Sequence, residues 1–518
     1  MRGHGNDAGV FVGVDIGTSA TKTTAYNAGG RDVAYARKGY PLTSRTPHRA
    51  EQDPDAILEA VLDTLGEAVM RCRAQGESVA AVSFSAAMHG VMALDAAGRP
   101  LTAFVTWADN RAAAQAQRLR DGEGGFDLYR RTGTPLHPMA PLSKIVWFRE
   151  HEPDLFERAA HWVSIKEYVM WRLFGELVVD HSVASASGLF DIERLAWDEG
   201  ALDVAGIGPD ELSTLVPATH LMSNLNAGVQ ERVGLPPDTQ FVVGASDGTL
   251  ANLGVGALRA DVAACTIGTS GAVRTCSAKP LTDPEGRTFC YVLEEGTWIV
   301  GGAVNNGGGA LAWVRDRLFP EAGDYDRLTE MAAAVPAGAE GVIFLPYLLG
   351  ERSPYWNPDA RAVFFGLSMR HGRDHLVRAV MEGVAFAMCN VLRVLEETAS
   401  EAVECRATGG FAQSPLWRQI VADVFDRPVA FPADHESSCF GAAIMAMKAV
   451  GVIDSLEAAD GLVRIEHRHE PNEQDADVYR RMMPLFADLY RDLEKEFASL
   501  TELQAAVESA DAVEPPQM

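Results

Sequence analysis

Two carboxylates in this sequence lie where an apolar, strand-like run gives way to small residues. Asp247 follows the run Phe241–Ala245, and Asp15 ends the run that begins at Val10. An aspartate at the start of a helix is kept ionised by the helix dipole, so Asp247 could act as the general base for a substrate hydroxyl. The simpler role for Asp247 is a helix N-cap, and both roles can hold together. Asp15 could hold a metal-bound water.

The residues after Asp15 predict a hairpin whose tip can approach a phosphate. Ile16-Gly17-Thr18-Ser19 lies between two strand-like runs, and its small residues leave backbone N–H groups accessible beside the hydroxyls of Thr18 and Ser19. The same four residues recur as Ile267-Gly268-Thr269-Ser270 in the same context. This repeat favours two similar halves that divide near residues 254–260, rather than one ordinary turn. Lys22 could pair with a phosphate or lie on an exposed strand.

Two further segments could bind a polyol. Met88 and His89 follow a predicted strand, and Trp107 lies close to Asp109 and Arg111. An aromatic face beside groups that form paired hydrogen bonds suits a sugar. The structural alternatives are a buried histidine without a ligand, and a helix capped by Asp109 with Arg111 in solvent.

Glycine-rich turns in the second half predict a nucleotide site. Glycines at 301–302 and 307–309 precede a helical segment, and 408–415 again has the order strand, glycines, helix. Such turns allow a nucleotide close to the backbone at a helix N-terminus. We therefore expect the nucleotide on the second half and the substrate on the first.

Composition excludes several classes of partner. The formal net charge of -26 argues against nucleic acid and anionic membrane. The seven cysteines form no C-x-x-C pair, the start resembles no signal peptide, and the longest uncharged runs are too polar to span a membrane. We expect a cytoplasmic protein, with monomer and homodimer both open. A helix is predicted from Pro484 to Leu500, with an apolar stripe of Leu485, Leu489, Leu493 and Phe497, followed by a mobile acidic tail over 501–518.

These segments, in this order, resemble the FGGY family of carbohydrate kinases from about Val10 to about Tyr490. The most specific piece is the segment from Gly341 through Pro346-Tyr347 and Glu351-Arg352-Ser353-Pro354 to Gly366-Leu367-Ser368, which resembles the long second signature of that family. The resemblance implies an α/β fold of two ribonuclease-H-like domains of the actin/Hsp70 superfamily flanking a central cleft, with ATP and Mg²⁺ between them. We expect a sugar-binding domain over 8–257, a nucleotide-binding domain over 258–500 and the tail.

The resemblance also implies roles for individual residues. Asp247 matches the catalytic base, and Met88 and His89 match positions that line the sugar site. Thr18 and Thr269 match the two phosphate-hairpin threonines, Gly308 and Gly410 match nucleotide-binding glycines, and Ser414 lies where relatives often have Asn near the nucleotide base. Ala312 departs from a Gln found in glycerol kinases.

The segment Thr132–Leu142, together with 107–111, is most similar to the branch that phosphorylates gluconate. The predicted reaction is D-gluconate to 6-phosphogluconate, and the candidate cations for the substrate carboxylate are Arg111, Lys144 and His137. The alternative for His137, which lies between Pro135 and Pro138, is a residue of a rigid loop. Xylulokinase is the alternative within the family, because Ser85–Gly90 is similar to its Ser-Gly-Gln-Met-His-Gly. The rival classes are a switching ATPase of the actin/Hsp70 type and a silent sugar sensor.

Overall fold

The computed structural model of the protein describes residues 9–44, 48–433 and 436–511. Of these residues, those within Met1–Ala260, Thr275–Val300 and Ala433–Arg464 form one compact unit, unit 1. Those within Asp261–Arg274, Gly301–Pro432 and Ile465–Met518 form unit 2. Each unit thus combines segments that are far apart in the sequence. The predicted sequence domains, 8–257 and 258–500, stay a prediction.

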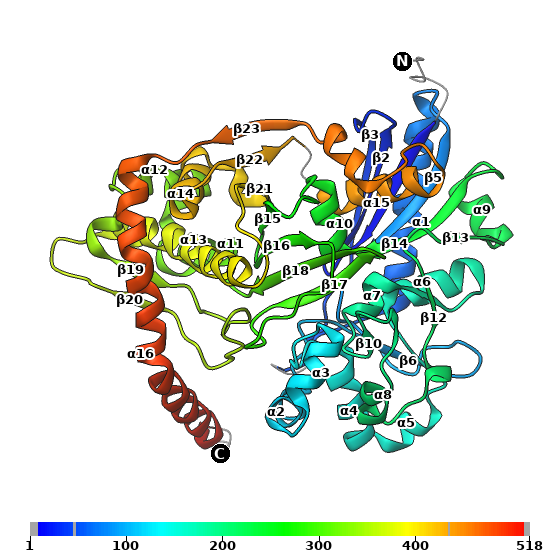
Figure 1. Cartoon of the computed structure of the whole chain (residues 1–518), viewed down its shortest axis with the longest axis horizontal. Helices are drawn as coiled ribbons and strands as arrows, with labels where there is room; N and C mark the ends of the chain where they lie inside the picture. Colours follow the sequence, from blue (N-terminus) through cyan, green and yellow to red (C-terminus); the bar gives the residue numbers. More distant parts are fainter. Residues whose placement is uncertain (1–8, 45–47, 434–435, 512–518) are drawn as a thin grey trace, which may run out of the picture. The chain divides into compact units, whose positions relative to one another are not determined.

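Unit 1 is built on a six-stranded mixed sheet (Figure 1). Its strand order is β13-β14-β5-β1-β2-β3. The first two strands, β1 (Val10–Ile16) and β2 (Ala20–Asn27), form the predicted antiparallel hairpin, and β1 pairs with β5 in parallel. The other strands are β3 (Asp32–Gly39), β5 (Val79–Ala86), β13 (Leu221–Met222) and β14 (Gln240–Ser246).

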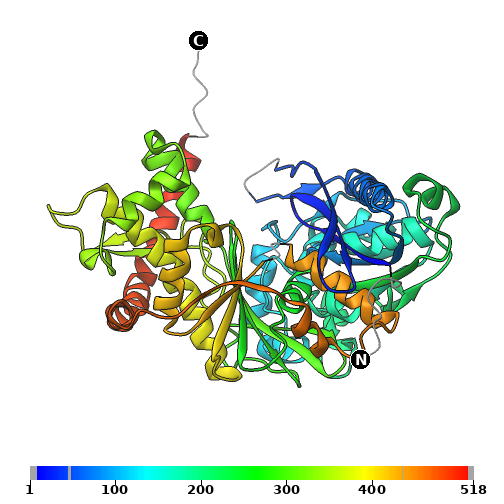
Figure 2. The same ribbon diagram turned by 90° about the horizontal axis from the view of Figure 1, so that it is seen from above.

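Successive side chains of a strand point to opposite faces of the sheet, so a largely apolar strand such as β1 needs cover on both faces. Different helices cover the two faces. Val10, Val12 and Val14 pack in one core with helix α1 (Pro54–Ala74), whose N-cap is Asp53. Phe11 packs in another core with α10 (Asp247–Gly254) and α15 (Ser437–Ala449). Figure 2 shows α15, in orange, beside the blue strands of the N-terminal segment.

Glycine allows α15 to lie this close. A Cβ on Gly13 would lie 1.9 Å from the carbonyl oxygen of Cys439, and one on Gly441 would lie 2.0 Å from that of Leu250. Any larger residue at either position would push α15 away from β1 or α10. The sequence therefore brings residues near 436 next to the first hairpin and to Asp247.

The rest of unit 1 is mainly helical, and its helices are α2 (Ala113–Asp121), α3 (Gly125–Thr132), α4 (Pro141–His151), α5 (Pro153–Arg158), α6 (Ile165–Phe174), α7 (His181–Ser185), α8 (Glu199–Ala205) and α9 (Ala227–Val233). Residues of α3, α4 and α8 share an apolar core of their own, whereas α6 and α9 pack in the same core as α1. Short strand pairs join these segments: β4 (Glu51–Gln52) with β7 (Phe104–Val105), β6 (Met92–Leu94) with β8 (His161–Val163), β9 (Val178–Asp180) with β12 (Thr214–Val216), and β10 (Phe190–Asp191) with β11 (Ala196–Trp197).

The second large sheet has the order β17-β18-β16-β15-β21-β22-β23. Its strands are β15 (Val262–Ile267), β16 (Gly271–Ser277), β17 (Phe289–Glu294), β18 (Thr297–Val304), β21 (Glu404–Thr408), β22 (Val429–Pro432) and β23 (Ile465–His469). The run β14-β5-β1-β2-β3 of the first sheet has its counterpart in β22-β21-β15-β16-β18. In both sheets the first strand forms an antiparallel hairpin with the second and pairs in parallel with a later one. The repeat predicted from Ile16–Ser19 and Ile267–Ser270 is thus a repeat of topology.

The helices of unit 2 include one that is strongly apolar. They are α11 (Gly308–Trp313), α12 (Tyr325–Ala333), α13 (Arg373–Thr398), α14 (Pro415–Phe425) and α16 (Glu473–Asp511), and a further short strand pair is β19 (Ile343–Leu345) with β20 (Val363–Phe365). Among the described residues, α13 alone is long and apolar enough to cross a membrane. Its apolar window is 83% buried within the fold, so packing accounts for its composition.

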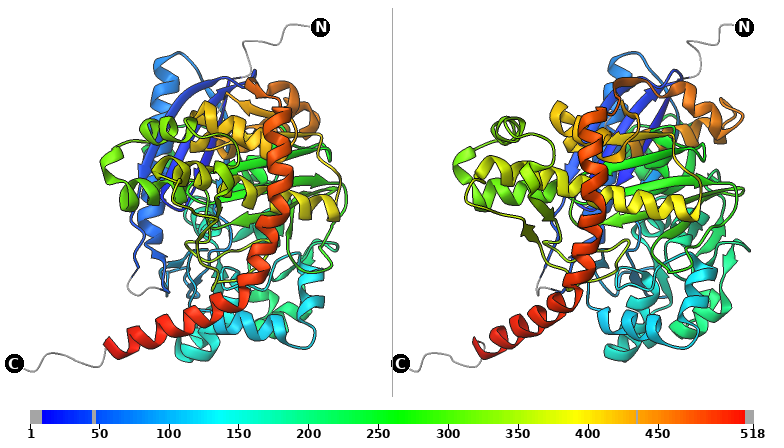
Figure 3. Two further views of the ribbon diagram at one scale, coloured as in Figure 1. Left: turned by 90° about the vertical axis from the view of Figure 1, so that its left-hand side faces the viewer. Right: turned by 60° about the vertical axis from the view of Figure 1, so that its left-hand side comes forward.

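The C-terminal helix differs from the prediction. Helix α16 runs along unit 2 (Figure 3), begins at Glu473 and has Pro484 in its interior, not in its first turn. Its described buried face consists of Ala476, Tyr479, Met482, Met483, Phe486, Tyr490 and Phe497, whereas Leu485 is 57% exposed. Of the other predicted stripe residues, Phe497 is buried and Leu489 and Leu493 are half-buried. The apolar positions before Pro484 were missed because the helix was predicted to begin there. The helix continues to Asp511, so part of the predicted tail is helical.

Candidate active site

Asp247 lies at the junction of β14 and α10, as the sequence predicted. Its side chain is half-buried, and its Oδ1 accepts a hydrogen bond of 2.7 Å from the N–H of Gly248. The hydroxyl of Ser438 on α15 donates to its carbonyl oxygen at 3.2 Å. The Ser438 hydrogen bond thus fixes the backbone of Asp247, and the position of its carboxylate at a helix N-terminus favours the ionised form. These are the properties that a general base for a hydroxyl needs.

The first hairpin tip is held in place by three side chains. Trp107 Nε1 donates to the Thr18 hydroxyl at 2.8 Å, and Gln52 Nε2 donates to the Thr18 carbonyl at 2.6 Å. The hydroxyl of Tyr40 donates to the carbonyl of Gly17. Trp107 is therefore tied to the predicted phosphate hairpin as well as lying among the predicted sugar residues. Ser19 at the tip is exposed.

Asp15 and Lys22 flank this tip and have close partners of their own. The Ser85 hydroxyl donates to Asp15 Oδ1 at 2.7 Å, and burial raises the pKa of Asp15 above its ordinary value. Lys22 Nζ lies 2.7 Å from the carboxylate of Glu436. Lys22 is thus neutralised by a carboxylate, which favours the strand alternative over a phosphate partner.

His89 is held on both sides of its ring. Its Nδ1 lies 2.8 Å from the carbonyl oxygen of Ala186, which fixes the proton on Nδ1, and Nε2 then accepts from the hydroxyl of Tyr291 at 3.3 Å. The backbone of His89 has a φ of 65°, an unusual value for a residue other than glycine and one often found at functional sites. Met88 next to it is half-buried. Tyr291 lies on β17, and no sequence pattern had linked it to His89.

Asp109 and Arg111 form a buried ion pair in place of an open sugar site. Asp109 is fully buried and accepts the N–H of Ala50 at 2.7 Å, and Arg111 donates to it from Nε and Nη2 at 2.8 Å. Arg111 also contacts Glu51 and stacks on two aromatic rings, those of Trp147 and Phe148. Its side chain is only 4% exposed. The prediction that Arg111 meets a substrate carboxylate is therefore corrected, because two carboxylates of the protein already neutralise it.

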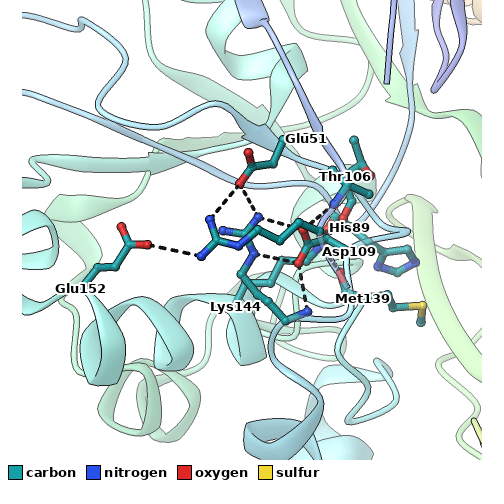
Figure 4. Close-up of polar contacts among 10 residues, drawn as sticks. Glu51, His89, Thr106, Asp109, Met139, Lys144 and Glu152 are labelled. Atoms are coloured by element: carbon teal, nitrogen blue, oxygen red, sulfur yellow. Dashed lines mark hydrogen bonds and ion pairs between the residues drawn. The ribbon is translucent and has the colours of Figure 1, made fainter. Parts of the chain in front are cut away.

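Lys144 requires the same correction. It is fully buried, and Nζ donates at 2.7 Å to each of three backbone carbonyl oxygens, those of His89, Thr106 and Met139 (Figure 4). An ammonium has three N–H donors, so all of them are used. Of the three predicted cations, His137 is half-exposed, and its Nδ1 accepts from the N–H of Met139 at 3.2 Å.

In unit 2 the second hairpin contacts the glycine turn directly. The N–H groups of Gly308 and Gly309 donate to the carbonyls of Gly268 and Thr269 at 2.6 and 3.0 Å. A Cβ on Gly307 would lie 2.4 Å from the carbonyl oxygen of Ser270. These hydrogen bonds join the hairpin to α11 and use the N–H groups of Gly308 and Gly309, while Thr269 is exposed at the tip of the hairpin. The exposed hydroxyl of Thr269 is the donor that this tip can offer to a phosphate.

The other predicted nucleotide residues lie around α14. Gly410 is exposed, and a Cβ there would meet nothing within 4 Å, so the protein's own packing does not require this glycine. Ser414 caps α14 through a hydrogen bond of 3.2 Å from the N–H of Trp417. Ala312 is half-buried on α11.

Glu351 was not predicted from sequence and supports the glycine turn. Its Oε1 accepts the N–H groups of Asn305 and Arg352 at 2.6 and 2.8 Å, and Asn306 Nδ2 donates to the carbonyl of Gly350 at 2.8 Å. Burial raises the pKa of Glu351 to about 7. The long signature thus holds the residues just before Gly307. A charged pair within an apolar segment was the signal that could have drawn attention to Glu351.

Comparison with known proteins agrees with this arrangement. The sequence model of the FGGY family of carbohydrate kinases, N-terminal domain, matches residues 10–254, and that of the C-terminal domain matches residues 263–450. The chain is 44% identical to the gluconokinase of Bacillus licheniformis over 509 residues, which is 96% of this chain and 99% of that protein.

Two solved structures from Lactobacillus acidophilus are also similar. One, a ligand-bound xylulose kinase, has a TM-score of 0.91 and 34% identity, with 95% of this chain and 99% of that chain covered. The other, a gluconate kinase, has a TM-score of 0.90 and 34% identity, with 95% and 100% covered. The chain therefore belongs to the FGGY family of carbohydrate kinases.

Proposed function

We propose that this carbohydrate kinase transfers the γ-phosphoryl group of ATP to D-gluconate, giving 6-phosphogluconate. The observation that supports gluconate is the 44% identity to a gluconokinase over nearly the full length of both chains. D-xylulose is the alternative acceptor, favoured by the similar solved xylulose kinase. We still predict a cytoplasmic location and no nucleic acid or membrane partner. Monomer and homodimer both stay open.

Asp247 is proposed as the general base. It would accept the proton of the attacking hydroxyl, and the helix N-terminus at which it lies favours the carboxylate that must do so. Phosphoryl transfer has a loose transition state and depends mainly on positioning and charge stabilisation, so a weak but correctly placed base is sufficient.

The two hairpin tips are proposed to bind the phosphate groups. Thr18 and Ser19 on the first tip and Thr269 on the second offer hydroxyl donors, and Gly410 leaves room for a nucleotide close to the backbone. Gly308, which packs against Gly268, is proposed to place the second tip beside the nucleotide. Ser414 is proposed to lie near the nucleotide base. In unit 1, Met88, His89 and Trp107 remain the proposed sugar contacts, and His137 is the remaining candidate for the substrate carboxylate.

Asp15 is proposed to hold Mg²⁺. Among the described residues there is no group of three or more His, Cys, Asp or Glu side chains that could cage a metal ion. One carboxylate fits Mg²⁺ nonetheless, because this ion keeps several waters and is usually bound through one or two carboxylates and the substrate phosphates. The raised pKa of Asp15 is also consistent with a carboxylate that would gain from a nearby cation. When bound, the ion would neutralise charge on the transferring phosphate.

The test is an ADP-release assay with Mg·ATP and a panel of D-gluconate, D-xylulose, glycerol, L-ribulose and L-rhamnulose. We expect turnover on gluconate above all others. In Asp247→Ala we expect kcat to fall at least about 10²-fold while ATP binding persists. Asp53→Asn is the control, because Asn caps the exposed start of α1 as well as Asp does. Turnover on xylulose instead would overturn the substrate, and wild-type turnover of Asp247→Ala would overturn the base.

A further inference from the structure

Lys144 ties together three segments that are separate in the sequence. Its Nζ donates at 2.7 Å to the carbonyl oxygens of His89, Thr106 and Met139. These residues are separated from Lys144 by 55, 38 and 5 positions in the sequence. The first lies in the turn between β5 and β6, the second after β7, and the third in the loop before α4. Figure 4 shows Lys144 with these residues and with Asp109.

Each of these segments also contains residues proposed to contact the substrate. His89 and Met88 lie in the first, Trp107 follows Thr106 in the second, and His137 precedes Met139 in the third. One buried ammonium therefore fixes the backbone beside every proposed sugar contact of unit 1. A displacement of about 1 Å in such contacts can change turnover about 10²-fold.

The charge of Lys144 is balanced locally. The charged groups around it are Asp109 and Arg111, and Arg111 also contacts Glu51. Glu51 lies 3.8 Å from Arg49, which lies 4.0 Å from Glu152. The three cations and three carboxylates of this cluster cancel, so the cluster has no net positive charge that would attract a substrate anion. Its three donors to carbonyls explain why a cation is buried here without a carboxylate in contact with it.

We propose that Lys144 is a positioning residue that sets the acceptor affinity and selectivity of the sugar site by holding its three loops through their backbones. This inference rests on the proposed sugar contacts of unit 1. It assigns Lys144 no contact with the substrate. The role is therefore distinct from that of a cation that pairs with the gluconate carboxylate.

The test compares Lys144→Met with Ser143→Ala. Met keeps the length of the side chain but offers no donor. Ser143 is the neighbouring buried residue on α4, and its hydroxyl has no hydrogen-bond partner among the described residues, so its loss should leave the KM for gluconate unchanged. We expect the KM for gluconate to rise at least tenfold in Lys144→Met and the ratio of gluconate to xylulose turnover to change. The KM for ATP should stay within twofold of wild type.

An unchanged KM for gluconate in a folded Lys144→Met protein would overturn the proposal. An equal fall in kcat on all acceptors with KM unchanged would also overturn it, because that result is expected of a merely structural role. If Lys144→Met does not fold, Lys144→Gln, which keeps two N–H donors, is judged by the same criteria. The comparison uses whichever acceptor the wild type phosphorylates best. An error in the proposed substrate is therefore seen in the wild-type panel, and an error in this inference only in the variants.

Discussion

Two lysines of unit 1, Lys144 and Lys166, are both buried, and the protein accommodates their charges differently. Lys166 on α6 lies 2.6 Å from the carboxylate of Asp180 and donates to the carbonyl of Ala245 at 3.0 Å. Within the part of the chain that the structure describes, Lys144 forms no ion pair with a carboxylate and donates to three carbonyls. Burial lowers the pKa of both, and Asp180 opposes this for Lys166. One lysine thus belongs to an ion pair, and the other completes a set of backbone hydrogen bonds.

The two arrangements stabilise different parts of the proposed site. Asp180 also caps α7 through the N–H of Val183 at 2.9 Å, and Ser182 in that helix accepts the N–H of Ser246 at 3.1 Å. The ion pair therefore supports the residues just before the proposed base, Asp247, whereas Lys144 supports the proposed sugar loops. We therefore expect loss of Lys166 to lower mainly the stability of the fold, and loss of Lys144 to lower mainly the affinity for the substrate.

The largest expected effect is that of Lys166→Met. The substitution leaves Asp180, which is fully buried, without its cation, and breaking a buried pair in this way costs about 3–5 kcal/mol. Denaturant unfolding would measure it. The double variant Lys166→Met with Asp180→Asn removes both charges and keeps the cap, so it should recover most of the loss. A double variant as unstable as the single one would show that the charge of Asp180 is not the cause.

A pH series tests the other lysine. Burial lowers the pKa of Lys144 to about 7, so the ammonium that donates to three carbonyls is the form present below this pH, whereas in the unfolded chain the pKa is near the ordinary 10.5. Between these values the unfolded chain binds more protons, so the contribution of Lys144 to the free energy of unfolding rises with pH, by at most about 1.4 kcal/mol per pH unit.

The measurement is the difference in thermal midpoint between wild type and Lys144→Met from pH 7 to pH 9.5. It should shift in favour of the wild type as pH rises, while Ser143→Ala follows the wild type throughout. If the difference in midpoint between wild type and Lys144→Met does not change with pH, Lys144 does not titrate in this range in the folded protein, because the carbonyls and Asp109 keep the ammonium charged.

The hairpins and the position of Asp247 could be predicted from sequence because their signals are local. A strand, a small-residue turn and a second strand are adjacent in the chain, and the recurrence of Ile-Gly-Thr-Ser gave the repeat. The predicted α/β fold of two ribonuclease-H-like domains is confirmed by the repeated sheet order and by the similar solved structures.

The partners of the charged residues could not be predicted. Arg111 meets Glu51 from 60 residues away, and Lys144 meets His89 from 55 residues away. Nothing in the local sequence of either residue distinguishes a cation that is buried against the backbone from one that binds a ligand. Long-range packing decides this, and it also produced the contact between Tyr291 and His89.

The smallest expected effect compares two buried serines, one beside each lysine arrangement. Ser182 lies 2.9 Å from the Ser246 hydroxyl and 2.8 Å from that of Thr249, so Ser182→Ala removes a shared hydrogen-bond partner and should cost about 1 kcal/mol in the free energy of unfolding. Ser143→Ala removes a buried hydroxyl that has no partner among the described residues, so it should not lower the free energy of unfolding. Because Ser182 contacts the residue before the proposed base, Ser182→Ala should also lower kcat modestly and leave the KM for gluconate unchanged, the opposite of Lys144→Met. Steady-state kinetics of Ser182→Ala and Lys144→Met side by side would measure these changes in kcat and KM. A rise in the KM for gluconate in Ser182→Ala would mean that the two buried arrangements are coupled and do not divide the site between them.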